Sequence, residues 1–499
     1  MLRSVARLLL PLAAVAAPAS AQLIAIKTVP VAQGDQFAIF PSDNAAMAGI
    51  GIALADTLFD PFANPAAGAR VGGPRFFGSP TLFNVSHDAG GGRTLPLGAL
   101  GSSGAWFGGV AAALQQVDAS RRPQFLPPPG PLADPVTTQP PLPPGQPATA
   151  EQSWGNTYAL GMVGRSFGAP GLSLGASVLW ANLNALDGVD LLYAGSERIL
   201  QSGGALDLRL GVLKEWSGDR SLEAIVLHNR FDMTHEVTYL DWVWDPGTQQ
   251  PVQVPRVEVN EDRTDTWGVH VEHARPLGRD GWRIGGLATA NRMSHPKIPN
   301  YEIVNVPRDP GYSTAFNLGL GVARGRGPAT PGLAVVSEPI WSETWAEAAA
   351  PTVTVGGDTI PAGGRTLENT FRFSNAHFRM GVGQRVGAVA TLQLGLALRS
   401  VHYHLDQLDP VQQTSRDHEE QWVEWTPTWG LGLHFPGLDL RYRGQVTHGT
   451  GRPGFAGAQP VVARGDVLAG GIIVAPSGPL TLDEVSVVTH QVSIALPLR

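Results

Sequence analysis

A period-two alternation of apolar and polar residues constrains the fold of this chain more than any other feature. It recurs in segments of about ten residues that are separated by turn residues. One segment places Leu206, Leu208, Leu210 and Val212 at alternate positions, with charged or small residues between them. Because successive side chains of a strand point to opposite faces of a sheet, this pattern predicts strands with one apolar and one polar face. The expected fold class is therefore all-β, although alternation alone does not distinguish a membrane barrel from a soluble sandwich.

The lengths of the links between the predicted strands decide between barrel and sandwich. Sixteen strands are expected, near 73–87, 93–101, 105–117, 153–167, 171–184, 204–217, 220–234, 263–278, 281–294, 313–324, 331–345, 367–385, 389–405, 420–434, 437–449 and 485–498. Tight turns alternate with long loops, which fall at 118–152, 235–262, 295–312, 346–366 and 450–484. Short turns on one rim and long loops on the other are typical of an outer-membrane barrel with both chain ends on the periplasmic side. The pattern predicts a transmembrane antiparallel β-barrel.

Tryptophan placement favours the same architecture. Most of the 13 Trp residues fall near the ends of predicted strands. Amphipathic rings gather in girdles at the two membrane interfaces of such barrels. Burial of these rings inside a sandwich is the alternative.

The polar face of the strands carries charged residues that would line or brace the lumen. These are Asp207, Arg209, His270, Glu272, Arg283, Arg399, Asp439, Arg441 and Arg443. Charges of both signs can pair with one another and hold an inserted segment. A polar diffusion path, as in a porin, is the alternative.

The amino terminus predicts export. Arg3 and Arg7 precede an apolar run from Leu8 to Ala17, and Ala19-Ser20-Ala21 provides the small residues that a signal peptidase needs before Gln22. The apolar run is too short to span a bilayer, so residues 1–21 are expected to be a cleaved signal peptide. The absence of Cys excludes a lipoprotein anchor, disulfides and Cys-ligated metals. A net charge of -7 without a basic run argues against nucleic-acid binding.

The stretch before the first predicted strand lacks the alternation. Ser42 or Asp43 can cap a helix that carries Met47, Ile50 and Leu54 at helical spacing. The surrounding Ala and Gly residues permit close packing against other elements. A compact insert ahead of a barrel suggests a plug in the lumen, and a solvent-exposed leading segment is the alternative.

The same stretch resembles a known family. Residues 46–56, Ala-Met-Ala-Gly-Ile-Gly-Ile-Ala-Leu-Ala-Asp, followed by Phe62-Ala63-Asn64-Pro65-Ala66, resemble the hatch signature of FadL-type outer-membrane transporters of long-chain fatty acids and other hydrophobic compounds. The motif positions are Gly49, Asp56, Asn64, Pro65 and Ala66. The resemblance implies a barrel of fourteen strands, an amino-terminal hatch in the lumen, and passage of an apolar ligand out through a lateral opening in the wall. The alternation in this chain gives sixteen strands, so the expected fold is a transmembrane antiparallel β-barrel of about 14 to 16 strands with an N-terminal hatch in the lumen.

The expected organisation is a signal peptide over 1–21, a hatch segment over 22–72 and an outer-membrane barrel over 73–499. Apolar residues of the hatch are the candidates for contact with a hydrophobic ligand, and packing within the plug is the alternative for most of them. The candidates are Phe37, Phe40, Met47, Ile50, Leu54, Phe59 and Phe62.

No catalytic residue, metal site or cofactor is expected. Ser86-His87-Asp88 would occupy successive positions of a strand, so their side chains would point to opposite faces and could not converge as a triad. His402 and His404 share one strand face and could bind a metal, but no third ligand is identifiable, which favours a polar wall or rim. Phosphate-binding, zinc-helix and calcium-loop motifs are absent at the required spacing. The chain is therefore not expected to be an enzyme.

The leading hypothesis is passive outer-membrane transport of hydrophobic molecules, such as long-chain fatty acids, by transient binding near the hatch and sideways release into the bilayer. A structural, porin-like or secretion-partner barrel without lipid transport is the alternative, and a secreted soluble β protein is a third reading. The expected partners are hydrophobic small molecules, outer-membrane lipids and, during biogenesis, the barrel assembly machinery.

Overall fold

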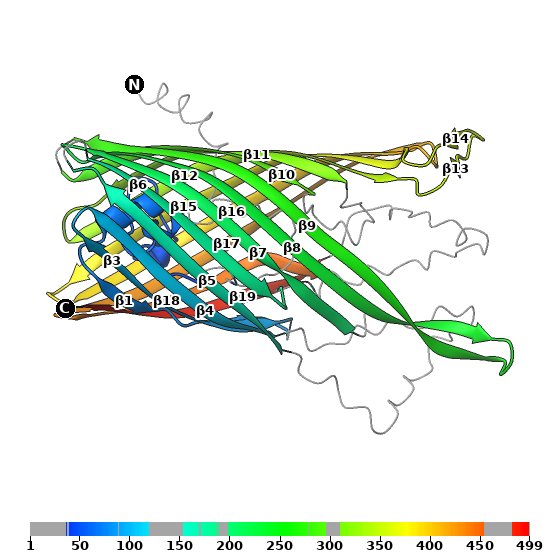
Figure 1. The fold of residues 1–499 in the computed structure, drawn as a ribbon, viewed down its shortest axis with the longest axis horizontal. Coiled ribbons are helices and arrows are strands. Elements are labelled where there is room, and N and C mark those ends of the chain that lie inside the picture. The colour runs from blue at the N-terminus through cyan, green and yellow to red at the C-terminus, as the bar shows by residue number, and fades with distance from the viewer. Residues whose placement is uncertain are drawn as a thin grey trace, which may run out of the picture.

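The computed structural model is a closed antiparallel β-barrel (Figure 1). It describes residues 36, 39–87, 89–118, 153–168, 171–186, 189, 198–278, 280–295, 310–453 and 482–498. The first strand is divided into β1 (Arg75–Gly78) and β2 (Thr81–Val85), and both halves pair with β3 (Gly91–Ser103) and with β19 (Leu482–Pro497). When the two halves are counted as one strand, the ring contains sixteen strands.

The other strands of the ring follow one another in chain order, each antiparallel to the one before it. They are β4 (Trp106–Asp118), β5 (Ser153–Ser166), β6 (Leu172–Leu183), β7 (Arg198–Trp216), β8 (Arg220–Asp245), β9 (Gln250–Leu277), β10 (Trp282–Ser294), β11 (Gly311–Arg324), β12 (Ala329–Glu347), β15 (Arg365–Val386), β16 (Ala390–Asp409), β17 (Thr414–Phe435) and β18 (Leu438–Pro453). A separate small sheet consists of β13 (Thr352–Val353) and β14 (Thr359–Ile360).

The strand count confirms the prediction from alternation and corrects the one implied by the family resemblance. Sixteen strands close the ring, so the expectation of fourteen is wrong for this chain. The long loop expected over 235–262 is also wrong, because β8 and β9 continue through it as a hairpin that projects from one end of the barrel (Figure 1). β-branched residues such as Val237, Val257 and Val259 recur along this hairpin and favour extended backbone.

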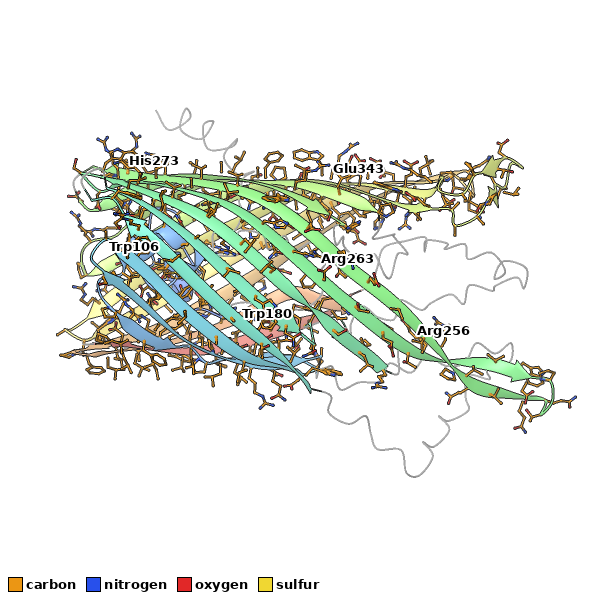
Figure 2. The ribbon with its side chains drawn as sticks, viewed as in Figure 1. Trp106, Trp180, Arg256, Arg263, His273 and Glu343 are labelled. Atoms are coloured by element: carbon orange, nitrogen blue, oxygen red, sulfur yellow. The ribbon has the colours of Figure 1, made fainter. Side chains whose placement is uncertain are left out.

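The apolar faces of the strands point outward. Leu208 and Leu210 are 41% and 64% exposed, whereas Asp207 is 6% exposed and faces the lumen. Exposed Trp side chains stand on the same outer surface, as Figure 2 shows for Trp106 and Trp180. A continuous apolar exterior on a closed barrel is the surface of a transmembrane β-barrel, and a soluble sandwich would bury it.

The described residues directly before the first strand lie inside the ring, where they appear in blue in Figure 1. Residues 39–72, here called the N-terminal segment, contain η2 (Ala45–Met47), α2 (Asp60–Ala63) and η3 (Pro65–Arg70). The first of these short helices contacts β15 to β18, and the last contacts β3 to β7. Because these strands lie on different sides of the ring, a single segment can reach both sets only from the lumen. No helix among the described residues is long and apolar enough to cross a membrane.

The regular helix expected after Ser42 does not form. The helix η2 ends after three residues, because Ala48, Gly49 and Ala53 have positive φ angles of 59°, 63° and 64°. Residues in this left-handed region cannot continue a right-handed helix. Ser42 does not cap a helix either, since its Oγ donates a hydrogen bond to Asp56 Oδ2 at 2.6 Å. The predicted signal peptide and Phe37 lie outside the described residues.

Glycines in the wall make room for the N-terminal segment. A Cβ atom added at Gly381 would lie 2.7 Å from the Met47 carbonyl oxygen, and one added at Gly175 would lie 2.6 Å from the Ala66 nitrogen. Glycine in a strand interior often marks the close approach of another backbone. Other wall glycines that face the segment in this way are Gly211, Gly285, Gly321, Gly332, Gly395 and Gly430. The segment is therefore closely fitted to the inner surface of the barrel.

Candidate functional site

Two arginines of the wall bind the first half of the N-terminal segment. Arg441 Nη2 lies 2.8 Å from Asp43 Oδ1. Arg379 Nη1 donates to the Gly49 carbonyl oxygen at 2.9 Å. These contacts come from β18 and β15, so one side of the ring holds the segment by a carboxylate and by its backbone.

A third arginine binds the second half of the segment from the other side of the ring. Arg209 Nη1 donates to the carbonyl oxygens of Phe62 and Ala63 at 3.3 Å and 3.2 Å. Asp207 holds this guanidinium in place through a contact of 2.6 Å to Nε. Inward-facing charged residues of the wall therefore contact the N-terminal segment at these positions.

Asp56, the acidic residue of the family-like motif, ties together two parts of the N-terminal segment. Its Oδ2 accepts hydrogen bonds from Ser42 Oγ at 2.6 Å and from the Asn44 nitrogen at 3.1 Å. Its Oδ1 accepts from the nitrogens of Leu58 and Phe59 at 3.2 Å and 2.9 Å. One buried carboxylate therefore satisfies donors on both sides of a loop that has little regular structure of its own.

The N-terminal segment holds carboxyl groups in an environment that favours protonation. Burial and the neighbouring Asp43 raise the pKa of Asp56 to about 6. Burial also raises the pKa of Asp60, as do the nearby Glu223 and Asp56, whereas Arg70 opposes the rise. The docked segment therefore binds protons more tightly than an undocked segment would.

The motif residues Asn64, Pro65 and Ala66 form the start of η3. The side chain of Asn64 accepts a hydrogen bond from the Ala66 nitrogen at 3.1 Å and thereby caps this helix. Proline suits the first helical position because its fixed φ matches a helix and its missing N–H would have no partner there. Asn64 Nδ2 also donates to Glu223 Oε2 on β8 at 2.9 Å. The motif thus ends one turn and attaches it to the wall.

Arg70 fixes the end of η3 to the same part of the wall. Its Nη1 lies 2.7 Å from Glu223 Oε1, and its Nε lies 3.0 Å from Glu215 Oε1. Asp60 of the segment lies 3.5 Å from the same guanidinium. The N-terminal segment is therefore anchored at both ends and along its length.

Three of the predicted ligand residues pack against each other and the wall. Met47, Ile50 and Leu54 are 2%, 0% and 9% exposed, and they form one cluster with Ala323 of β11. Phe59 is partly buried. In the described structure these residues serve as packing between the segment and the wall, which is the alternative that the sequence left open.

The aromatic residues of the segment form a stack that reaches the first strand of the barrel. The rings of Phe40 and Phe62 are stacked with centroids 4.0 Å apart, and Phe62 meets Phe77 of β1 edge to face at 5.5 Å. Phe40 and the wall residue Leu179 also contact a second apolar cluster, which includes Tyr158. The stack therefore joins two apolar areas of the inner surface into one.

The first strand of the barrel is divided into β1 and β2 next to this stack. Between β1 and β2, Ser79 and Pro80 face Pro96 and Leu95 of β3, and neither proline has an N–H to donate to the sheet. The Ser79 nitrogen still donates to the Pro96 carbonyl oxygen at 3.1 Å. The Val492 nitrogen of β19 likewise donates to the Pro80 carbonyl oxygen at 3.0 Å. Pairing with both neighbours therefore continues through this point, which we call the β1–β2 break and which lacks only the N–H groups that the two prolines cannot supply.

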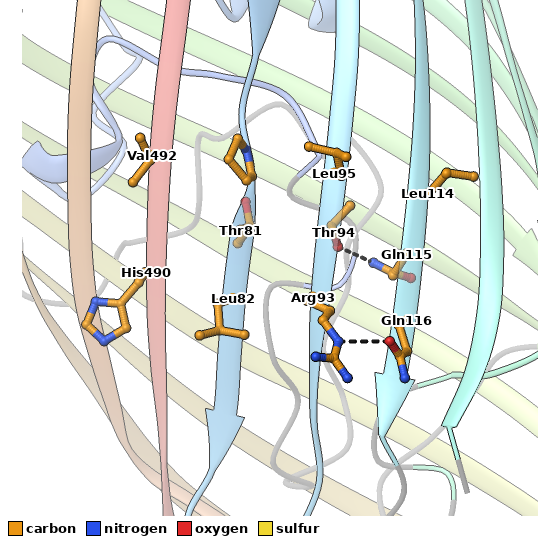
Figure 3. A pocket seen from close by; sticks show the side chains of 11 residues that line it. Thr81, Leu82, Arg93, Thr94, Leu95, Leu114, Gln115, Gln116, His490 and Val492 are labelled. Atoms are coloured by element: carbon orange, nitrogen blue, oxygen red, sulfur yellow. Dashed lines mark hydrogen bonds between the residues drawn. The ribbon is translucent and has the colours of Figure 1, made fainter.

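A hollow of about 560 Å³ lies at the β1–β2 break (Figure 3). Its apolar residues belong to the outer face, where Leu82, Leu95 and Leu114 are 53%, 47% and 63% exposed. Buried polar residues of the inner face, among them Thr94 and Gln115, also line it. The hollow therefore lies on the outer face, at strands whose alternate side chains point inward.

Gln115 connects this hollow to the interior. Its Oε1 accepts hydrogen bonds from Asn156 Nδ2 at 2.9 Å and from Tyr158 Oη at 2.8 Å. Its Nε2 donates to Thr94 Oγ1 at 2.9 Å, as Figure 3 shows, and to the Gln36 carbonyl oxygen at 2.6 Å. The polar groups behind the break are thus satisfied by one another, while the surfaces on either side are apolar.

Several residues of this area were missed by sequence reasoning. Phe77 and Gln115 look like ordinary strand residues, and nothing in their spacing sets them apart. Pro80 and Pro96 do carry a signal, since proline inside a predicted strand indicates an edge, a bulge or an interruption. The wall glycines also carry a signal, since glycine inside a predicted strand often marks the close approach of another backbone.

Comparison with known proteins adds the following findings. No known family model matches the chain, and no curated protein matches it. Among solved structures, the toluene transporter TodX of Pseudomonas putida matches at 12% identity, covering 91% of this chain and 97% of that chain with a TM-score of 0.40. A FadL homologue of Pseudomonas aeruginosa matches at 12% identity, covering 92% and 99% with a TM-score of 0.43. A bacterial polysaccharide outer membrane secretin matches at 6% identity, covering 86% and 99% with a TM-score of 0.38.

Proposed function

We propose that this chain is a passive bacterial outer-membrane channel for hydrophobic molecules, such as long-chain fatty acids or similarly apolar compounds. The N-terminal segment acts as a hatch that closes the lumen. The observation that carries the proposal is the aromatic stack of Phe40, Phe62 and Phe77, which continues the apolar inner surface up to the β1–β2 break. An apolar inner surface suits an apolar ligand, whereas the interior of a water-filled porin is polar.

Transport would follow from burial of apolar surface. A ligand that leaves water for the apolar inner wall gains roughly 25 cal/mol for each Å² buried. Its next apolar environment is the bilayer, which it reaches through the β1–β2 break without returning to water. This route needs neither a cofactor nor an energy source.

The candidate ligand residues divide into two groups under this proposal. Phe40 and Phe62 lie on the apolar inner surface and are the best supported contacts for a ligand. Met47, Ile50 and Leu54 would meet a ligand only when the hatch shifts. We expect Phe62→Ala to reduce uptake of an apolar substrate several-fold while the barrel remains folded, as judged by its heat-modifiable mobility in gels.

Native mass spectrometry of the detergent-purified protein tests the ligand class. A co-purified apolar molecule, such as a fatty acid, supports the proposal. A protein that requires detergent but never retains or takes up an apolar compound would favour a porin-like or partner-binding barrel. A protein that is soluble without detergent would contradict the outer-membrane assignment itself.

A cross-link across the β1–β2 break tests the lateral route. The chain has no Cys, so an engineered pair is unique. Thr81 and Thr94 are directly paired between β2 and β3, and directly opposed residues are close enough for a disulfide. We expect oxidation of Thr81→Cys/Thr94→Cys to stop uptake and reduction to restore it. The matched control is Leu97→Cys/Ala112→Cys in the neighbouring β3–β4 pair. Equal uptake by both oxidised variants would exclude a lateral exit at this point.

A further inference from the structure

A cluster of histidine and carboxylate side chains lies on the outer face of β16 and β17. Along β16, apolar residues such as Leu394 are followed toward the tip of the hairpin by His402, His404 and Asp406. In the paired strand β17, Asp417 lies opposite Asp406. Strand pairing therefore brings a second carboxylate, that of Asp417, next to His404 and Asp406.

The ligand atoms of this cluster converge. His404 Nε2 lies 3.1 Å from Asp406 Oδ1 and 3.2 Å from Asp417 Oδ2, and all three atoms lie within 4.8 Å of one another. A zinc ion with bonds of about 2.0 Å and tetrahedral angles holds its ligand atoms about 3.3 Å apart. The two distances from the imidazole nitrogen match this spacing.

The electrostatics of the cluster favour a cation. Asp406 and Asp417 are directly opposite each other, and like charges in such a pair destabilise a sheet. A neutral imidazole has at most one proton, and Nε2 faces both carboxylates. Arg372 Nη2 lies 3.5 Å from Asp406 Oδ2, so it approaches the other oxygen of that carboxylate and leaves Oδ1 directed at His404. The arginine thus orients one ligand without occupying the place of an ion.

The cluster is accessible from solvent and has a neighbour of the same kind. The side chains of His404, Asp406 and Asp417 are 31%, 45% and 71% exposed. His402 Nε2 lies 2.6 Å from Glu419 Oε1 on the same outer face. Along β17 the exposed apolar residues end at Val423 and Trp425, and the outward residues nearer the hairpin tip are polar. On β16 the outward Leu408, beyond the cluster, is 48% exposed. An ion could therefore reach the cluster from water.

We propose that His404, Asp406 and Asp417 form a binding site for a divalent metal ion of the zinc class. The imidazole favours zinc over calcium and magnesium, which prefer an all-oxygen shell. The bound ion would join β16 to β17 near their connection and remove the repulsion between the two aspartates. Water would complete its coordination.

Metal titration of the purified, chelator-treated protein without a histidine tag tests the site. We expect one zinc equivalent to bind at least tenfold more weakly to His404→Gln and to Asp417→Asn than to the wild type. We also expect Co²⁺ to give the intense visible absorption of a tetrahedral centre in the wild type only. His434→Gln is the matched control, because His434 contacts a single carboxylate, that of Asp439, at 2.9 Å.

Three outcomes would overturn the proposal. The first is zinc binding that is equal in the wild type and both site variants. The second is equal loss in the His434→Gln control, which would indicate dispersed surface binding. The third is a preference for calcium or magnesium, which would indicate a carboxylate site without a role for the histidine. Heat-modifiable gel mobility of each variant keeps a folding defect distinguishable from a loss of the site.

Discussion

At the scale of single residues, Asp56 is the side chain on which the N-terminal segment most depends. Its two oxygens accept four hydrogen bonds, from Ser42, Asn44, Leu58 and Phe59. Asp56→Asn keeps the shape of the side chain but replaces one carboxylate oxygen with an NH₂ group. That group is a donor, and it would face two of the donors that the oxygen now accepts from. We expect this to destabilise the docked segment by about 1–3 kcal/mol. Hydrogen exchange of the amides over 44–60 measures the effect.

Thr57→Ala is the control for that substitution. Thr57 lies in the same loop, but its side chain is exposed and donates only to Asp43 Oδ2 at 3.0 Å. Exchange rates that increase equally in both variants would show that Asp56 has no special role in holding the loop.

The pKa of Asp56 also predicts how docking depends on pH. The folded value of about 6 is above the ordinary value of 3.8, so the docked segment binds a proton that an undocked segment releases. Its stability is then greatest below about pH 4 and is lost as the pH rises through about 6. The raised pKa of Asp60 acts in the same direction.

We therefore expect the amides over 44–60 to exchange several-fold faster at pH 7.5 than at pH 5, after correction for intrinsic rates. The increase should be smaller in Asp56→Asn, which has no carboxyl group to titrate. Faster exchange at the lower pH would contradict the predicted sign.

At the scale of elements, the wall glycines and the N-terminal segment fit closely against one another. A Cβ atom at Gly381 would lie 2.7 Å from the Met47 carbonyl oxygen. Overpacking of this kind costs about 1–3 kcal/mol. We expect Gly381→Ala to loosen the segment and to increase its cleavage by a broad-specificity protease.

Gly161→Ala is the matched control for the wall glycines. Nothing lies within 4 Å of a Cβ atom added at Gly161, which also sits in a wall strand. Protease resistance that is equal in the two variants would show that the wall can absorb the added methyl group and that the fit is not restrictive.

The strands of the wall could be predicted from the sequence, whereas the β8–β9 hairpin and the backbone after Ser42 could not. Alternation predicted the sixteen strands, because the two faces of a barrel wall meet lipid and lumen over their whole length. It failed for the outer part of the β8–β9 hairpin, where most described side chains from Val243 to Val259 are exposed and no buried face enforces a pattern. The helix expected after Ser42 failed for a different reason, since positive φ at Ala48 and Ala53 is imposed by packing against the wall. A backbone shape set by distant strands leaves little trace in local sequence.

The candidate site was predictable in part for the same reason. The motif around Asp56 and Asn64 was visible because local hydrogen bonds and caps require particular residues at fixed spacing. The roles of Phe77 and Gln115 could not be predicted, because they arise from contacts with residues that are distant in the sequence. Phe77 packs against Phe62 of the N-terminal segment, and Gln115 forms hydrogen bonds with residues on the two neighbouring strands. The sequence drew attention to His404, but the proximity of Asp417 on β17 became apparent only through the strand register.

At the scale of the whole molecule, the proposed function requires the N-terminal segment to block the lumen and to be displaceable. Thr428 and Gln393 of the wall form hydrogen bonds with the first half of the segment, and two arginines add charged contacts to it. Arg441 pairs with Asp43 at 2.8 Å, and Arg379 donates to the Gly49 carbonyl oxygen at 2.9 Å. A hydrogen bond to a charged group contributes about 1.5–3 kcal/mol. Loss of both arginines should therefore loosen the first half of the segment without removing any residue from the outer surface.

We expect Arg379→Ala/Arg441→Ala to raise ion conductance in planar bilayers several-fold over that of the wild type, because water and ions would enter the space that the segment now fills. Arg365→Ala is the control, since Arg365 lies on the same strand as Arg379 but its ion pair with Glu368 is exposed. Conductance that stays at the wild-type level, despite faster exchange in the segment, would show that the segment is not the barrier. The lumen would then have to be closed by residues other than 39–72, and the hatch would be a structural brace of the wall.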